Sequence, residues 1–297
     1  FYNGNSQLVQ IRDSVRLIDQ DMSLVTNSLD YDRKTTKAIY HELGTITSTQ
    51  NDNKLVSKHG VYNSATKMFY FRDSVRLENP SYLVKTDTLN YANNTEIAYF
   101  EGPTFIYSDE NTIYCENGWY DTKQDLSQFN ENAYLDNGKQ KLGGDSLKYD
   151  RNLGIGEAFQ NIQIADSIDQ TLILGQYGYY NELKGTSLVT GEPEFIQYDA
   201  LDSLYLHGDT LFAINDTING DRISVYPEVR FYRKDMQGAA DSVVYSKNDS
   251  LIHMFRNPIL WADDMQITGD TIDIKSFAGQ IQNLFVYDHA FMVNKLD

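Results

Sequence analysis

The chain has 297 residues, with 42 acidic against 25 basic side chains and a formal net charge of −17. Phosphate binding needs clustered Lys and Arg, so this charge disfavours a nucleic-acid partner and simple electrostatic docking to anionic lipid head groups. The 22 Tyr and 14 Phe residues, together with many Thr, Val and Ile, favour strands and predict an all-β chain.

A five-residue phrase that ends in an aromatic or aliphatic anchor recurs nine times. The anchors are Tyr31, Tyr62, Tyr91, Tyr120, Tyr149, Tyr180, Ala213, Tyr245 and Ile274, and successive anchors lie 29 to 33 residues apart. A fixed period in this range is typical of stacked repeats, in which each unit buries its apolar face against its neighbours. We therefore expect one elongated repeat domain over residues 1–297. Because the chain begins partway through a repeat, we also expect it to be a piece of a longer chain.

Each repeat is predicted to contain a hairpin. In Asp145-Ser-Leu-Lys-Tyr149, period-two alternation places Asp145, Leu147 and Tyr149 on one face, as in a half-buried strand. Polar turn residues follow the anchors, for example at 32–36, 92–95, 121–124 and 150–154. A second strand then returns, as at 97–100 and 251–255.

Four of the five prolines mark a corner in the returning strand. Pro103, Pro193, Pro227 and Pro258 lie 12 to 14 residues after their anchors, and Asn132 and Asn161 hold the same place in other repeats. Proline cannot donate a ladder hydrogen bond, so it belongs at an edge, a bulge or a bend.

A second reversal closes most repeats, at 50–53, 79–81, 108–111, 136–139, 165–167 and 262–264. This gives two long bent strands per repeat, about eighteen in all. The expected fold is an elongated antiparallel β-jelly roll with a V-shaped or flattened section. A parallel β-helix is the alternative.

The phrase D-[ST]-[LIV]-x-Y-D, its turn and the following V-x-[IL] stretch carry a family resemblance, strongest in residues 87–106 and 145–164. They resemble the OstA-like family of lipopolysaccharide-transport proteins, the relatives of LptA, and the Tyr- and Asp-rich form resembles that of Bacteroidota. The resemblance implies a non-enzymatic periplasmic β-jelly roll that binds lipopolysaccharide and shields the acyl chains of lipid A in an apolar groove. It also implies edge-to-edge joining to other transport proteins.

A groove for acyl chains needs a continuous apolar lining, and equivalent positions of successive repeats supply one. The candidates on the anchor strands are Leu29, Tyr31, Leu89, Tyr91, Leu147, Tyr149, Leu211, Ile272 and Ile274. On the returning strands Phe100, Ile106, Ile162 and Ile164 would face them. The alternative is that all these side chains fill a closed core.

The terminal units lack the polar capping of a closed solenoid end. The apolar residues there are Val9, Ile11, Val15 and Leu17 at one end and Phe285, Val286, Phe291 and Val293 at the other. An open strand edge recruits another strand. These edges therefore either join another protomer, giving a head-to-tail homo-oligomer, or meet a missing repeat.

Signals for catalysis, metal or cofactor binding are weak, and we expect none of the three. The five histidines, at 41, 59, 207, 253 and 289, share no place in the repeat. Residues 154–159 are predicted to form a turn rather than a dinucleotide site, and 215–220 lack the glutamate of a calcium loop. The recurring Asp-Ser and Asp-Thr pairs are assigned to turns at the strand entries. A second hypothesis is an extracellular β-solenoid that binds or cleaves carbohydrate through a surface row of aromatic and carboxylate residues.

Overall fold

The computed structural model describes residues 1–18, 22–48, 52–109, 111–198, 203–215, 220–246, 251–262, 264–277 and 280–294. Within these ranges the regular structure is entirely β, and there is no helix long and apolar enough to cross a membrane. The chain divides into two compact units. Unit 1 comprises residues 1–138 and 146–152, and unit 2 comprises residues 139–145 and 153–297. A single repeat domain over residues 1–297 stays a prediction.

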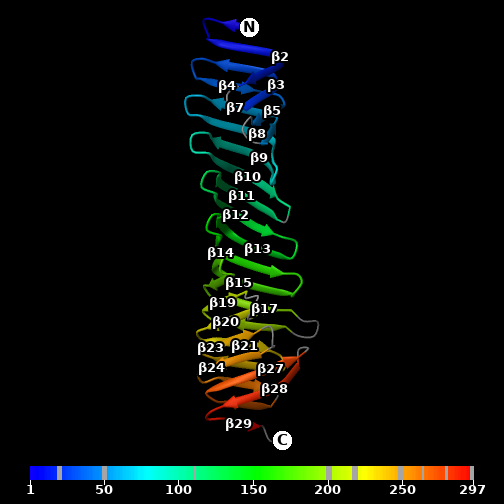
Figure 1. The fold of residues 1–297 in the computed structure, drawn as a ribbon, viewed down its shortest axis with the longest axis vertical. Helices are drawn as coiled ribbons and strands as arrows, with labels where there is room; N and C mark the ends of the chain where they lie inside the picture. Colours follow the sequence, from blue (N-terminus) through cyan, green and yellow to red (C-terminus); the bar gives the residue numbers. More distant parts are fainter. Residues whose placement is uncertain are drawn as a thin grey trace. The chain divides into compact units, whose positions relative to one another are not determined.

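The strands run back and forth between two rows of turns in each unit (Figure 1). Those that lie wholly in unit 1 are β1 (Tyr2–Asn3), β2 (Leu8–Ile18), β3 (Met22–Asp32), β4 (Lys37–Tyr40), β5 (Gly44–Ser48), β6 (Lys54–Ser57), β7 (His59–Asn63), β8 (Met68–Asn79), β9 (Tyr82–Ala92), β10 (Ile97–Tyr107), β11 (Thr112–Asp121) and β12 (Leu126–Asp136). Residues of both units make up β13 (Gln140–Asp150).

Unit 2 continues with β14 (Ile155–Asp166), β15 (Thr171–Asn181), β16 (Thr186–Thr190), β17 (Glu194–Gln197), β18 (Leu204–His207), β19 (Thr210–Ile214), β20 (Arg222–Tyr226), β21 (Val229–Arg233) and β22 (Met236–Ala240). It ends with β23 (Ser242–Ser246), β24 (Leu251–Phe255), β25 (Ile259–Ala262), β26 (Met265–Thr268), β27 (Thr271–Phe277), β28 (Gln280–Tyr287) and β29 (Phe291–Asn294).

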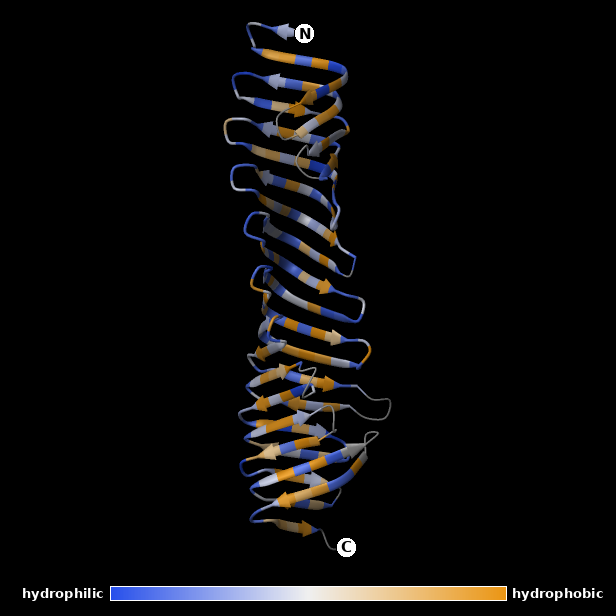
Figure 2. Ribbon diagram, viewed as in Figure 1, coloured by the Kyte–Doolittle hydropathy of each residue, from blue (hydrophilic) through white to orange (hydrophobic). Residues whose placement is uncertain are grey.

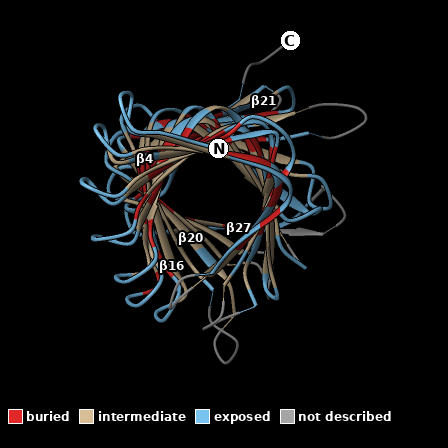
Figure 3. Cartoon of the chain, turned by 90° about the horizontal axis from the view of Figure 1, so that it is seen from above, coloured by how far each residue is buried: buried red, intermediate tan, exposed pale blue. Residues whose placement is uncertain are grey.

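Neighbouring strands within each unit pair antiparallel, for example β9 with β10 and β10 with β11 in unit 1, and β24 with β27 in unit 2. Hydrophobic and hydrophilic residues alternate along the strands (Figure 2). The exposed residues gather in the turns, and the buried ones lie on the strands (Figure 3). Each unit is therefore an antiparallel β-jelly roll, as expected, and the alternative of a parallel β-helix is wrong.

The predicted corners are confirmed and have a common backbone geometry. In β10 the register shifts between Glu101 and Thr104, where Gly102 has a φ of 95° before Pro103. At the equivalent corners Asn132 has a φ of 59° and Asn161 a φ of 52°. One extra residue with a left-handed backbone makes a β-bulge, which bends the strand. Each bent strand thus has two arms: arm A meets the turn that follows the anchor, and arm B lies beyond the corner.

From β16 onward the corner interrupts the strand altogether. Gly191, with a φ of 75°, and Pro193 separate β16 from β17, and Arg256 and Asn257, with φ of 62° and 56°, separate β24 from β25. Two further corners, at 13–14 and 73–74, carry Asp-Ser rather than Pro or Asn, and the sequence analysis did not predict them.

The turns after the anchors are linked to one another by backbone hydrogen bonds. The amide of Thr122 donates to the carbonyl of Glu96 at 3.0 Å, and that of Glu182 donates to Gly154 at 2.8 Å. Asp121, which follows its anchor, accepts from the amides of Lys123 and Gln124, both at 2.9 Å. The Asp after an anchor is therefore a turn residue.

Some local predictions differ from the structure or lie partly outside the described residues. The Asp of the Asp-Ser and Asp-Thr pairs lies inside a strand in two repeats, as Asp87 does in β9 and Asp145 in β13. In three others it directly precedes a strand, as predicted: Asp209 before β19, Asp241 before β23 and Asp270 before β27. Strand β14 extends to Asp166, so the second turn there occupies 167–170 instead of 165–167. The segments expected at 50–53, 108–111, 215–220 and 262–264 lie partly outside the described residues.

Candidate functional site

The inner side of arm A in unit 1 is a row that alternates large and small residues. Cross-strand pairing joins Tyr40, Gly60, Phe71, Leu89, Phe100, Gly118 and Phe129 in that order. A Cβ atom at Gly60 would lie 2.3 Å from the ring of Tyr40, so the glycine makes room for the phenol. The sequence analysis predicted Leu89 and Phe100 of this row and missed the glycines, which take the place of Leu89 in the phrase in other repeats.

The anchor tyrosines form a second inner row, closer to the turns. Tyr31, Tyr62, Tyr91 and Tyr120 lie opposite the small residue Ala38 or Ala98, and the ring of Tyr62 stacks on Phe69 with centroids 4.3 Å apart. The Tyr120 hydroxyl donates to Asp125 at 2.7 Å. Burial, assisted by Asp125, raises the pKa of Tyr120 to about 12. This row is apolar along its rings and polar at its tips.

The inner side of arm B in unit 1 is a continuous aliphatic row, called the arm B row below. Its members, one on each neighbouring bent strand, are Leu17, Leu24, Ile46, Leu55, Leu77, Val84, Ile106, Ile113 and Leu135. Leu24, Leu55 and Val84 are buried, whereas Ile46, Leu77, Ile106, Ile113 and Leu135 stay half-buried. Solvent therefore reaches part of an otherwise aliphatic surface. Only Ile106 of this row was predicted as lining.

Hydroxyl groups line the inner corner of unit 1 between the two arms. Thr104 is fully buried and donates to Thr86 at 2.8 Å, and the hydroxyls of Tyr40 and Ser57 lie 2.6 Å apart. Cys115, also fully buried, faces Thr104 across the strand pair, and burial raises the pKa of its thiol to about 12. The hydroxyls satisfy one another, so they provide no free hydrogen-bonding group for a ligand.

The interior of unit 2 closes along its length. Its arm B row runs through Ile173, Phe195, Leu206, Phe231, Gly238, Leu260 and Ile267. The first three are half-buried, whereas Leu260 is 0% and Ile267 2% exposed. From β20 to β27 the buried side chains form one apolar cluster, here called the closed cluster: Val225, Val229, Phe231, Met236, Val243, Met254, Leu260, Ile267, Ile272 and Ile274, which also includes Leu211 of β19 and Val189 of β16.

The predicted lining residues fall into two groups. Leu29, Leu89, Phe100, Leu147 and Ile162 are buried, and Tyr31, Tyr91, Ile106, Tyr149 and Ile164 are half-buried. Leu211, Ile272 and Ile274 belong to the closed cluster. Lipid contact by any of them stays a prediction.

Comparison with known proteins shows the family of the chain. The family model described as OstA-like protein matches residues 1–87 and 89–189, which is more than half of the chain. The chain belongs to the OstA-like family. Among solved structures, it is similar to LptH, described as the LptA homologous periplasmic component of the conserved lipopolysaccharide transport device from Pseudomonas aeruginosa. That likeness has 13% sequence identity and a TM-score of 0.34, and covers 53% of this chain and 95% of that chain. No curated protein matches the chain.

The OstA-like match ends at Val189, in β16, before the strands that contribute most of the closed cluster. The matched residues thus contain the half-buried inner rows of unit 1 and the first strands of unit 2.

The predicted edge residues lie on three strands, β2, β28 and β29. Strand β2 pairs along its length with β3, but β1 covers its other side only at Leu8 and Val9. In unit 2, β28 pairs with β27 and β29 with β26. Ile11, Leu17, Phe285, Phe291 and Val293 are exposed, Val9 and Val286 are half-buried, and Val15 is buried and points into the core.

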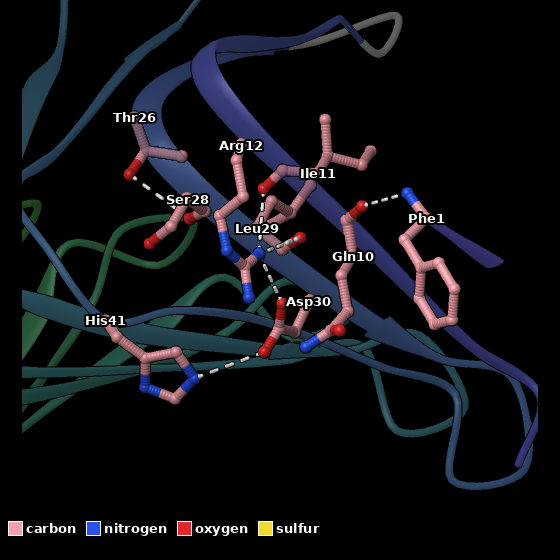
Figure 4. A network of polar contacts seen from close by, with 9 residues as sticks. All are labelled: Phe1, Gln10, Ile11, Arg12, Thr26, Ser28, Leu29, Asp30 and His41. Atoms are coloured by element: carbon pink, nitrogen blue, oxygen red, sulfur yellow. Dashed lines mark hydrogen bonds and ion pairs between the residues drawn. The ribbon is translucent and has the colours of Figure 1, made fainter. Parts of the chain in front are cut away.

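A polar network on β2, β3 and the residue after β4 contains the residue types of a nucleophilic triad (Figure 4). Asp30 forms an ion pair with Arg12, which lowers the pKa of the carboxyl, and His41 lies 3.8 Å from Asp30. The hydroxyl of Ser28 is buried and has no hydrogen-bond partner. Because no hydrogen bond joins Ser28 to His41, this network is not a Ser-His-Asp relay.

Other polar features are similarly local. A hollow of about 730 Å³ at a corner of unit 2 is lined mainly by Ser242, Arg256, Asn257, Asp270 and Thr271. Arg256 is already paired with Asp241 at 2.8 Å. His59, His253 and His289 each face one Asp. In the described part of the chain, no three His, Cys, Asp or Glu side chains are grouped as metal ligands.

Proposed function

We propose that this OstA-like protein binds lipopolysaccharide in the periplasm as part of its transport, without catalysis, and holds the acyl chains of lipid A along its inner rows. The observation that carries the proposal is the arm B row of unit 1, which is aliphatic on every strand and only half-buried at Ile46, Ile106 and Ile113. Family membership supports the choice of lipopolysaccharide.

The energetics favour acyl chains over head groups as the part that is held. Each Å² of apolar surface removed from water contributes about 25 cal/mol to binding. A longer acyl chain laid along the half-buried row buries more apolar surface and is therefore bound more tightly. The net charge of −17 disfavours direct contact with lipid phosphates. We therefore assign the head group to the outside of the units.

The closed cluster limits the proposed binding region. Met254, Leu260, Ile272 and Ile274 are 0% exposed, so they have no free surface for a ligand. We assign Leu211, Ile272 and Ile274 to packing, and confine acyl-chain contact to unit 1 and to β14–β18.

A pair of substitutions on one strand tests the proposal. Ile46 points inward from β5 and Thr47 is exposed beside it. Ile46→Lys places an ammonium group on the aliphatic row and is expected to weaken lipid A binding by the purified protein at least about tenfold, because an acyl chain cannot solvate a charge. Thr47→Lys is expected to bind like the wild type. Equal binding by the two variants, with unchanged thermal unfolding, would contradict the proposal.

We further propose that the edges of β2 and of β28 and β29 join other transport proteins or further copies of this chain. Exposed Phe291 and Val293 on β29 leave an apolar strand edge, which recruits a partner strand. Phe291→Lys with Val293→Lys should weaken any concentration-dependent association seen by sedimentation. Association that persists unchanged in this variant and in Leu17→Lys would exclude these edges.

A further inference from the structure

The outer face of arm B in unit 2 carries a straight row of aromatic and amide side chains, here called the outer strip. Cross-strand pairing places Tyr205, Tyr232, Gln237, Trp261 and Gln266 on successive neighbouring strands. Their neighbours along the chain, among them Leu206, Phe231 and Leu260, pack inward with the core. Because side chains alternate along a strand, the strip faces outward.

The rings of the strip are exposed and hold no aromatic partner within the described residues. Tyr205 is 40%, Tyr232 51% and Trp261 39% exposed. By contrast, the outer rings of unit 1 cover one another, since Phe105 and Tyr114 have centroids 4.9 Å apart and Tyr114 and Tyr134 5.3 Å. The faces of the strip are therefore open to a ligand in a way that those rings are not.

A side-chain hydrogen bond orients one ring of the strip. The indole nitrogen of Trp261 donates to the side-chain oxygen of Gln266 at 3.0 Å, which fixes the plane of the indole and leaves the amide nitrogen of Gln266 to donate elsewhere. Gln237, between Tyr232 and Trp261, is exposed. No member of the strip is charged, although the chain carries a net charge of −17.

We propose that the outer strip binds a straight, uncharged glycan chain with β-1,4 linkages. Sugar rings stack their C–H faces on aromatic side chains, and their hydroxyls pair with amides. Tyr232 and Trp261 are two strand spacings apart, roughly 10 Å, which is about one disaccharide of such a chain. Alternate sugars of a straight β-1,4 chain present the same face, so two rings at this spacing contact equivalent faces. The strip is one residue wide, whereas a protein interface needs about 20–30 residues a side.

Fluorescence of Trp261 tests the proposal. The chain has two tryptophans, so Trp119→Phe leaves Trp261 as the single indole reporter. Titration with cellohexaose is expected to shift its emission saturably, and maltohexaose, the same sugar in a curved α-1,4 chain, to bind at least about tenfold more weakly. Tyr232→Ala in this background should weaken cellohexaose binding by about tenfold or more, and Gln237→Ala should weaken it by less. Tyr99→Ala, an exposed outer residue of unit 1, should have no effect.

Several outcomes would overturn the proposal. They are an emission that neither sugar changes, equal binding of the two sugars, and binding that Tyr232→Ala leaves intact. Concentration-dependent self-association that Tyr232→Ala abolishes, without any glycan binding, would assign the strip to a protein contact instead. The strip lies on the outer face, whereas acyl chains are proposed to lie along the inner rows, and Tyr232 is on β21, beyond the proposed lipid region. Tyr232→Ala should therefore retain lipid A binding, and a failure of either proposal is separable from the other.

Discussion

At the scale of single residues, the interior of unit 1 is set by complementary sizes on neighbouring strands. The phrase that repeats along the chain has Leu at one position in Leu29, Leu89 and Leu147, and Gly at the same position in Gly60, Gly118 and Gly178. The glycines are not flexible points, because none of the three has a positive φ. The Tyr40 ring fills the place beside Gly60, the Ile162 side chain lies against Gly178, and the backbone carbonyl of Gln128 approaches Gly118.

Gly60→Ala tests this account of the glycines. The added methyl group would lie 2.3 Å from the Tyr40 ring, so the variant should lose about 1–3 kcal/mol of unfolding free energy through overpacking. Gly4→Ala is the matched control, because nothing lies within 4 Å of its Cβ position. Chemical denaturation of the two variants gives the comparison. A Gly60→Ala protein as stable as Gly4→Ala would show that the ring does not occupy this space.

The ion pair between Asp30 and Arg12 predicts a pH dependence. The hydrogen bond from Arg12 holds the pKa of Asp30 below its usual value of 3.8. A carboxyl with a lowered pKa stabilises the fold above the unfolded value, and this contribution is lost as the pH falls through the folded pKa. Asp30→Asn should therefore be less stable than the wild type near neutral pH, and the difference should shrink as the pH falls below 3.8.

The measurement is denaturant unfolding of both proteins across this pH range. Because Arg12 and Asp30 are partly exposed, added salt should reduce the neutral-pH difference. A difference that stays constant down to strongly acidic pH would mean that the ionised carboxylate contributes nothing to stability.

At the scale of elements, the corner is the feature that turns paired strands into a jelly roll. Its position could be predicted from the prolines and from Asn132 and Asn161. Proline interrupts the hydrogen-bond ladder between strands, and asparagine readily adopts a left-handed backbone. The corners at Asp13 and Asp73 were missed, since an Asp-Ser pair occurs elsewhere in the repeat and carries no such signal. The turns that follow the anchors were predicted correctly, because Asp, Asn and Gly recur there.

Gly102→Ala isolates the backbone strain of one corner. Gly102 has a φ of 95° and nothing within 4 Å of its Cβ position, so a methyl group there meets no neighbour. The expected loss of about 1 kcal/mol in unfolding free energy is due to the backbone alone. Glu131→Gly, at a φ of 60° in the next corner, should be neutral or stabilising for the same reason. A stabilising Gly102→Ala together with a destabilising Glu131→Gly would refute a left-handed corner.

At the scale of the whole molecule, the sequence could predict part of the candidate site. The inward position of the residues on the anchor strands could be predicted because they sit in the repeating phrase. The arm B row was found only at Ile106, because most strands contribute to it from stretches with no constant phrase. Whether the interior is closed depends on side-chain volumes across many strands, and periodicity along one strand carries no information about that.

We therefore propose different roles for two regions of the chain that share one fold. Unit 1 and the first strands of unit 2 keep a half-buried aliphatic surface and carry the OstA-like match, whereas β20 to β27 surround a closed cluster. We expect ligand contact in the first region and packing alone in the second. A lipid probe that labels whatever lies beside its acyl chains distinguishes these regions without any substitution.

The most direct test is photocrosslinking with lipid A that carries a diazirine in an acyl chain, followed by mass-spectrometric mapping of the labelled residues. We predict labels on inward residues before β19, such as Tyr91, Ile113 and Leu147, and none on Leu260 or Ile272 of the closed cluster. Labels confined to outward residues such as Asn90 and Lys148 would contradict it.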